Sequence, residues 1–260
     1  MSLFNNSDLQ QKFSQINPRV RQLAYDSLTP ILAYTTIGGV GAAMMESAYD
    51  EGYGKYSFIG INPLATLRAT ACDVTIDYDG TTTSHQVDPY SLLPEFTHDR
   101  KAFGFITYDG VRVKERLPDR HPPKAVPDFF FRLYKTVICF DHQAQKLIIN
   151  HEGSDAEIDE IVQKLFTITS APTFVKQAKV ELVSDVSDEE YMQKVIRAKE
   201  YIRQGDIFQV VLSRTFIADL DIPPFALYRA LRKLNPTPYL YLFEEEEFAI
   251  AGASPELLVG

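Results

Sequence analysis

ATLRATACDVTIDYDGTTTSHQVD, residues 65–88, is the most informative stretch for the fold class. Two β-rich runs meet at Tyr78-Asp79-Gly80, and Asp-Gly tolerates the positive φ angles of a tight turn, so the stretch predicts a β-hairpin. Similar runs, rich in β-branched and aromatic residues and bounded by Gly, Pro or Asp, predict further strands between about residues 30 and 150. They are ILAYTTI (31–37), KYSFIGI (55–61), AFGFITYD (102–109), FFFRLYKTVICFD (129–141) and KLIINHE (146–152).

Helices are predicted around this β-rich region. Those at residues 8–16 and 188–204 begin at capping boxes, in which a serine is followed three residues later by Gln or Glu. The helix at 188–204 also carries an apolar face, and Gly205 directly after it favours helix termination. The predicted helices span residues 8–16, 155–166, 188–204 and 224–235.

A domain junction is expected at residues 171–187, because this segment shows no long period and contains a proline. Residues 1–170 then form a first domain, and residues 188–260 begin a second one. In the second domain, strands are predicted in DIFQVVLSRTFI (206–217), PYLYLF (238–243) and EFAIAGAS (247–254).

The composition excludes several classes of partner. The net charge of −9 and the pI of about 5.1 disfavour binding to nucleic acid or to an anionic membrane. The absence of a long apolar run and of a secretory signal predicts a cytoplasmic protein without a membrane span. Cys72 and Cys139 are expected to be reduced core thiols, and the five histidines lack the spacing of a zinc site.

Three polar features leave alternatives open. Glu244 to Glu247 form an acidic turn, which we interpret as a solvated hairpin tip rather than a metal site. Gln209 lies among apolar neighbours, which predicts a buried amide that either bridges two sites or only satisfies backbone groups. Glu256 is either structural or close to a substrate pocket.

Four segments carry most of the functional information. Each is a weak signal alone, whereas four in a fixed order and with consistent spacing form a specific signature. They are MMESAYDEGYGKYSFIGINP (44–63), GFITYDGVRVKERLP (104–118), IRQGDIFQVVLSRTF (202–216) and NPTPYLYLF (235–243), the last followed by GASPELLVG (252–260).

Together these segments resemble the chorismate-utilising enzymes of the anthranilate synthase component I type. The resemblance implies an α+β fold with large antiparallel β-sheets flanked by helices. It also implies a lyase that converts chorismate and ammonia to anthranilate and pyruvate in tryptophan biosynthesis. The expected cofactor is Mg²⁺, and the expected partner is a glutamine amidotransferase subunit that supplies ammonia, so the enzyme would be a hetero-oligomer.

The third segment separates two branches of this family. Aminodeoxychorismate (p-aminobenzoate) synthase tends to read GDIYQVNL here, so Phe208 and Val211 favour the anthranilate branch without excluding the other. The chain departs from the family at Leu212, where proline is usual.

In this family, the feedback inhibitor tryptophan lies between the first and fourth segments. Ser47, Pro238, Tyr239 and Leu240 therefore match its binding residues, and Glu46 and Lys55 are added as charged partners for an ammonium and a carboxylate. The alternative is that Glu46 and Lys55 form an ordinary ion pair and that residues 238–243 are only a core strand.

The resemblance places the chorismate ligands, the general base and the magnesium ligands beyond residue 260. We therefore predict no catalytic or metal-binding residue in this chain, and no synthase activity from these 260 residues alone. Because the sequence stops inside an apolar run, we expect it to continue. An alternative from another class is a non-catalytic module that binds an amino acid.

Overall fold

The computed structural model describes residues 18–47, 55–97, 100–118, 125–167, 170 and 180–257. By contacts, the chain forms two compact units, one of residues 1–172 with 224–260 and one of residues 173–223. The helix predicted at residues 8–16 lies outside the described residues.

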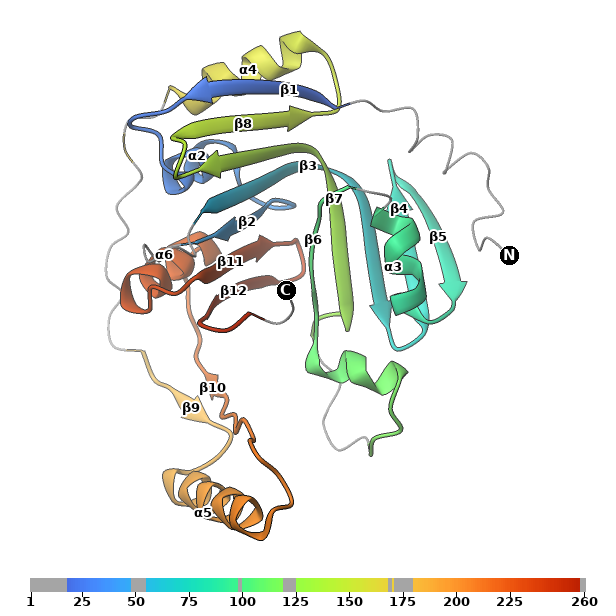
Figure 1. Ribbon diagram of the computed structural model, residues 1–260, viewed down its shortest axis with the longest axis vertical. Coiled ribbons are helices and arrows are strands. Elements are labelled where there is room, and N and C mark those ends of the chain that lie inside the picture. The colour runs from blue at the N-terminus through green and yellow to red at the C-terminus, as the bar shows by residue number, and fades with distance from the viewer. Residues whose placement is uncertain are drawn as a thin grey trace. The chain divides into compact units, whose positions relative to one another are not determined.

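The first unit is built on one sheet in which every strand pair is antiparallel. Its strands are β1 Arg19–Ala24, β2 Ala43–Glu46, β3 Tyr56–Thr70, β4 Asp73–Tyr78, β5 Thr81–Gln86, β6 Ala102–Ile106, β7 Phe129–Asp141, β8 Lys146–His151, β11 Tyr239–Glu244 and β12 Ala249–Ser254. The main path is β1-β8-β7-β3-β2-β11-β12, with β4, β5 and β6 as branches (Figure 1). The predicted α+β fold with a large antiparallel sheet flanked by helices is confirmed.

Two long central strands, β3 and β7, hold this sheet together. Their pairing extends from Tyr56 opposite Asp141 to Ala69 opposite Phe129, with an irregularity between Pro63 and Ala65. One half of the pair adjoins β2 and β8, and the other half adjoins β4 and β6. The strands that carry the first and second sequence segments therefore share one sheet.

Helices cover the sheet and bury its apolar side chains. They are α2 Pro30–Ile37, α3 Pro89–Thr97, α4 Asp155–Leu165 and α6 Pro224–Leu234, with a short 3₁₀ helix at Tyr108–Val113. Tyr34 of α2, Leu165 of α4 and Tyr228 of α6 share one core with strand residues such as Ile138 and Leu242. Each such side chain contributes roughly 1.5–3 kcal/mol through burial, so these helices are fixed mainly by packing.

Local sequence signals explain several elements. Asp79 and Gly80 have φ angles of 51° and 76°, as the predicted hairpin between β4 and β5 requires. The predicted helix at 155–166 is α4, and its capping box joins Ser154 to Glu157. The strand expected at residues 31–37 is wrong: Thr29 caps the helix α2, and Pro30 occupies its first turn.

The expected domain division differs from the observed grouping. Residues 224–260 were expected in the second domain, yet they belong to the first unit by contacts. The reason is that β11 pairs with β2 along Leu240–Phe243. The division into residues 1–170, 171–187 and 188–260 stays a prediction.

The smaller unit contains the helix α5 (Asp188–Gln204) and a two-stranded pair of β9 (Val183–Ser184) and β10 (Phe216–Ile217). As predicted, α5 has a capping box and a left-handed Gly205 at its end, with φ of 82°. The predicted long strand is wrong, because only Phe216 and Ile217 are extended and paired. Gln209 is exposed rather than buried.

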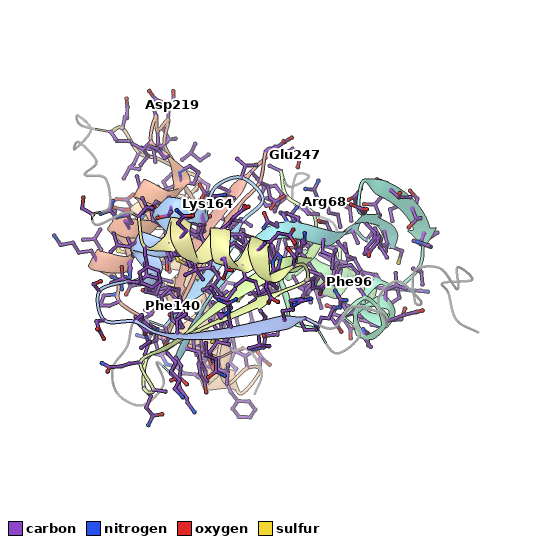
Figure 2. All side chains as sticks on the ribbon, turned by 90° about the horizontal axis from the view of Figure 1, so that it is seen from above. Arg68, Phe96, Phe140, Lys164, Asp219 and Glu247 are labelled. Carbon is purple, nitrogen blue, oxygen red and sulfur yellow. The ribbon has the colours of Figure 1, made fainter. Side chains whose placement is uncertain are left out.

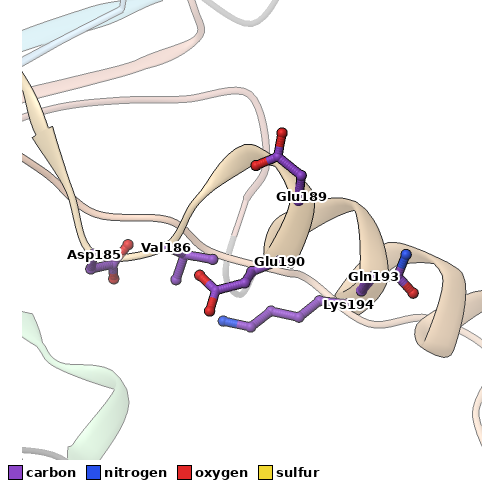
Figure 3. A pocket seen from close by; sticks show the side chains of 6 residues that line it. All are labelled: Asp185, Val186, Glu189, Glu190, Gln193 and Lys194. Carbon is purple, nitrogen blue, oxygen red and sulfur yellow. The ribbon is translucent and has the colours of Figure 1, made fainter.

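A hollow lies beside the first turns of α5 (Figure 3). Within it, the Glu190 carboxylate accepts the Ser187 backbone N–H at 3.0 Å, so part of its polar surface belongs to the helix cap. This hollow contains none of the residues that the sequence selected for a site. It is lined by Asp185, Val186, Glu189, Glu190, Gln193 and Lys194.

Candidate functional site

The first and fourth sequence segments meet because β2 and β11 are neighbours. Leu240 pairs with Glu46, and Tyr241 pairs with Met45. Continued by one residue, this antiparallel register sets Ser47 opposite Tyr239, which in turn pairs with Ser254 of β12. The structure thus brings together two parts of the predicted site that are far apart in the sequence.

Ser47 supplies an unused hydroxyl at the end of β2. Its Oγ is buried and has no hydrogen-bond partner within the part of the chain that the structure describes. Its backbone N–H donates to Ser57 Oγ at 3.4 Å. A buried hydroxyl without a partner costs free energy unless a ligand or water satisfies it, so Ser47 marks a position where a polar ligand group would be stabilised.

Thr237 is a second residue of this kind, and sequence reasoning missed it. It is 6% exposed, and its Oγ1 also has no partner among the described residues. Thr237 directly precedes the half-buried Pro238 and Tyr239, at the start of β11. Its position inside the fourth segment was the available signal, but burial of a threonine hydroxyl cannot be seen in sequence.

Glu46 is held by the helix α6 rather than by Lys55. The Tyr228 hydroxyl donates to Glu46 Oε2 at 2.9 Å, and Arg232 donates to both carboxylate oxygens at 2.8 and 2.7 Å. This bonding raises the pKa of Arg232, and burial beside Glu46 raises the pKa of Tyr228. The alternative of a Glu46–Lys55 ion pair is therefore wrong.

Lys55 remains an exposed cation. Its ammonium lies 5.0 Å from the centre of the Tyr56 ring, and a hydrogen bond to Tyr56 raises the pKa of Lys55. The other part of the alternative is right only in that residues 239–244 form a strand in the sheet, in which Leu240 is 1% exposed. Leu240 thus faces the core, whereas Pro238 and Tyr239 are half-buried.

The acidic turn is a solvated hairpin tip only in part, because Glu246 and Glu247 are exposed but the other two glutamates are not. Glu244 and Glu245 are each only 9% exposed. Tyr34 donates to Glu244 Oε2 at 2.6 Å, and Arg132 forms two bonds to Glu245 at 2.5 and 2.7 Å. Arg68 and Glu247, which are labelled in Figure 2, form an outer ion pair at 3.3 Å. These contacts attach the β11–β12 turn to the rest of the sheet.

The described residues do not fit a magnesium site. Among them, no group of three or more His, Cys, Asp or Glu side chains could hold a metal ion. The carboxylates of Glu244, Glu245 and Glu247 are instead bonded to tyrosine or arginine. We therefore derive no step through a metal from this chain.

A family model described as chorismate binding enzyme matches residues 43–260. The chain belongs to the chorismate binding enzyme family. Within this family, it is 30% identical to anthranilate synthase component 1 of Lactococcus lactis, over 93% of this chain and 58% of that protein. It is 32% identical to the Thermus thermophilus protein of the same name, over 94% of this chain and 57% of that protein. The chain thus spans less than two thirds of the length of these relatives.

Solved structures agree with this family assignment. The fold matches anthranilate synthase component I from Streptococcus pneumoniae with a TM-score of 0.62 and 25% identity, over 91% of this chain and 57% of that one. It also matches the isochorismate synthase MenF from Escherichia coli with a TM-score of 0.54, over 96% of this chain and 54% of that one, at 16% identity. The latter supports the fold alone. The resemblance to anthranilate synthase component I is confirmed.

In the part of the chain that the structure describes, no helix is long and apolar enough to cross a membrane.

Proposed function

We propose that the full-length protein is component I of an anthranilate synthase and that the residues around Ser47 and Tyr239 bind tryptophan as a feedback inhibitor. The observation that supports the second part is the buried Ser47 hydroxyl where β2 and β11 meet, which has no hydrogen-bond partner among the described residues. The family and the names of the relatives support the first part.

The site has the groups that a free amino acid needs. Ser47 and Thr237 offer hydroxyls that can donate to a carboxylate, and the exposed ammonium of Lys55 adds a positive charge. Pro238 and Tyr239 offer apolar surface for a side chain. Glu46 accepts three hydrogen bonds and therefore keeps about one free acceptor position, on Oε1, for the ligand's ammonium. The positive charge of Arg232 weakens this last attraction.

The proposed reaction uses chorismate and ammonia and yields anthranilate and pyruvate. A glutamine amidotransferase subunit would supply the ammonia, and Mg²⁺ bound outside the described residues would act as a Lewis acid on the substrate. The protein would work in the cytoplasm as a hetero-oligomer. Incubation of the full-length protein with chorismate, ammonium and Mg²⁺ should produce anthranilate. Aminodeoxychorismate as the main product would assign the protein to the other branch, and binding of tryptophan without turnover would support a regulatory module.

Ser47→Phe is expected to relieve tryptophan inhibition without loss of ammonia-dependent turnover. The added ring would occupy the space that a ligand needs, and overpacking of this kind typically costs about 1–3 kcal/mol. A cost of 1.4 kcal/mol or more, within this range, raises the inhibition constant about tenfold or more. Anthranilate fluorescence measured against tryptophan concentration gives the inhibition constant and the rate of uninhibited, ammonia-dependent turnover.

Ser84→Phe is the matched control, because Ser84 is exposed on β5 and lies outside the site. It should leave the inhibition constant unchanged. An unchanged constant in Ser47→Phe as well would show that Ser47 is not part of the inhibitor site.

A further inference from the structure

A chain of hydrogen bonds lies behind Ser47. Ser57 of β3 is fully buried, and its Oγ lies 3.4 Å from the Ser47 backbone nitrogen and 2.7 Å from His142 Nε2. The other ring nitrogen of His142, Nδ1, lies 3.2 Å from the Tyr25 hydroxyl. This series of hydrogen bonds runs from Tyr25 through His142 and Ser57 to the backbone of Ser47.

His142 also contacts the second charged part of the candidate site. Its backbone N–H donates to the Lys55 carbonyl at 3.0 Å. Its ring stacks on Phe140, with centroids 6.4 Å apart and planes 18° apart. Residue 142 therefore contacts Lys55 through its backbone, whereas its ring contacts Ser57 behind Ser47 and packs beside Phe140.

The bonding of Ser57 indicates how the protons are arranged. Its hydroxyl has two described contacts, and it accepts from the Ser47 N–H, so its own proton must go to His142 Nε2. The neutral ring then carries its proton on Nδ1 and donates to the Tyr25 oxygen. In this arrangement the Ser57 hydroxyl and both ring nitrogens of His142 have partners.

Protonation of His142 breaks this arrangement. Both ring nitrogens become donors, so Nε2 no longer accepts the Ser57 proton. The buried Ser57 hydroxyl then faces two donors, Nε2–H and the Ser47 N–H, and it has no described acceptor for its own proton. The oxygen has two acceptor positions and can still accept from both donors, but its own proton is then buried without a described acceptor. Rotation of the Ser57 side chain toward another acceptor relieves this cost and weakens the bond to the Ser47 backbone.

We propose that His142 is a positioning residue of the inhibitor site and that its protonation through Ser57 weakens tryptophan binding at acidic pH. This inference rests on the proposed function, since it assigns a regulatory property to the same site.

The surrounding charges define the pH range. Burial lowers the pKa of His142 below 6.5, and Arg232 of α6 lowers it further, whereas Glu46 of β2 and Asp141 of β7 act in the opposite direction. The ring is therefore neutral at pH 7.5 and gains its proton below pH 6.5. Because tryptophan favours the neutral ring, its affinity falls as the pH falls through this pKa. The ligand's own ammonium and carboxylate keep their charges over this range.

Calorimetric titration of tryptophan into the full-length protein at pH 7.5 and pH 5.5 tests the inference. In the wild-type protein, the dissociation constant should rise as the pH falls, by up to about tenfold per pH unit once the pH is below the pKa of His142, as linkage to one proton allows. His142→Gln has no titrating ring, so its affinity should not depend on pH in this range. Ser57→Ala should bind more weakly at pH 7.5 and show the same loss of pH dependence.

His85→Gln is the matched control, since His85 lies on β5, where its Nε2 contacts Thr83. It should keep the wild-type pH dependence, and thermal unfolding should confirm that all variants are folded at both pH values. Equal wild-type affinity at the two pH values would overturn this inference but not the proposed inhibitor site. A pH dependence that persists in His142→Gln would do the same. Absence of tryptophan binding at pH 7.5 would instead contradict the proposed inhibitor site, and this inference with it.

Discussion

Arg132→Ala is expected to lower the free energy of unfolding by about 3–5 kcal/mol, the usual cost of removing one partner of a buried ion pair. Arg132 is 5% exposed and bonds both oxygens of Glu245, the Thr66 hydroxyl at 2.9 Å and the Gly41 carbonyl at 3.0 Å. The substitution leaves the Glu245 carboxylate buried with only the partly exposed Arg68 as a partner. Urea unfolding at neutral pH measures the loss.

Two comparisons separate this effect from the loss of a large side chain. Arg21→Ala removes an arginine from an ion pair with Asp159 in which both side chains are more than one third exposed, so its cost should stay below about 1 kcal/mol. The double substitution Arg132→Met with Glu245→Leu removes both charges and should cost less than Arg132→Ala alone. If Arg132→Ala costs no more than Arg21→Ala, the turn between β11 and β12 is not attached through this ion pair.

Arg232→Ala is expected to cost about 2 kcal/mol, less than the range for fully buried pairs because the Arg232 side chain is 40% exposed. Its partner Glu46 is 2% exposed at the side chain and would keep only the Tyr228 hydroxyl. Since Arg232 and Tyr228 belong to α6 and Glu46 to β2, the loss would loosen this helix beside the candidate site. Denaturant unfolding gives the free energy.

The variant Arg232→Lys separates the effect of the positive charge from that of the two-pronged hydrogen bonding. It keeps the positive charge but loses the planar fork that bonds both oxygens, so its cost should fall between those of the wild type and of the alanine variant. The exposed Arg203, which pairs with Glu200 on α5, supplies the control for the Arg→Ala change on a helix surface. If Arg232→Ala is as stable as the wild type, the bonds from Arg232 to Glu46 do not stabilise the attachment of α6 to β2.

The fold was predictable where the signal is local. The hairpin at Asp79-Gly80 and the capping box at Ser187 each depend on a few neighbouring residues, and both predictions are confirmed. The capping box at Ser154 is equally local but was found only in the structure. The β-branched residues of 31–37 misled the prediction, because Thr29 and Pro30 outweigh their strand preference. The run at 206–217 is equally apolar, yet Phe208 is fully exposed and only the last two residues pair.

The candidate site was predictable only as far as the family motifs extend. They selected Ser47 and Tyr239, and the pairing of β2 with β11 brings these residues together. Burial and hydrogen bonding between distant segments leave no mark on a single sequence. For that reason Thr237, the Ser57–His142 contact and the partners of Glu46 appeared only in the structure.

The two ends of β11 are attached in different ways. Near Leu240, the neighbouring Glu46 is bonded to α6, and beyond Phe243 the two buried glutamates are bonded to Tyr34 and Arg132. A ligand at Ser47 and Tyr239 would therefore contact a strand that is firmly held in the first unit. Such a ligand can shift a conformational equilibrium only by its differential affinity for the two states.

Calorimetric titration of tryptophan into the full-length protein, with and without saturating chorismate and with Mg²⁺ omitted to stop turnover, tests the central claim most directly. We predict saturable binding to the wild type, a dissociation constant about tenfold higher or more in Ser47→Phe, and weaker binding when chorismate is present. Linkage requires each ligand to weaken the other by the same factor, typically about 5- to 150-fold. Tryptophan binding with equal affinity in the wild type and Ser47→Phe, or no binding at all, would contradict the assignment of this site.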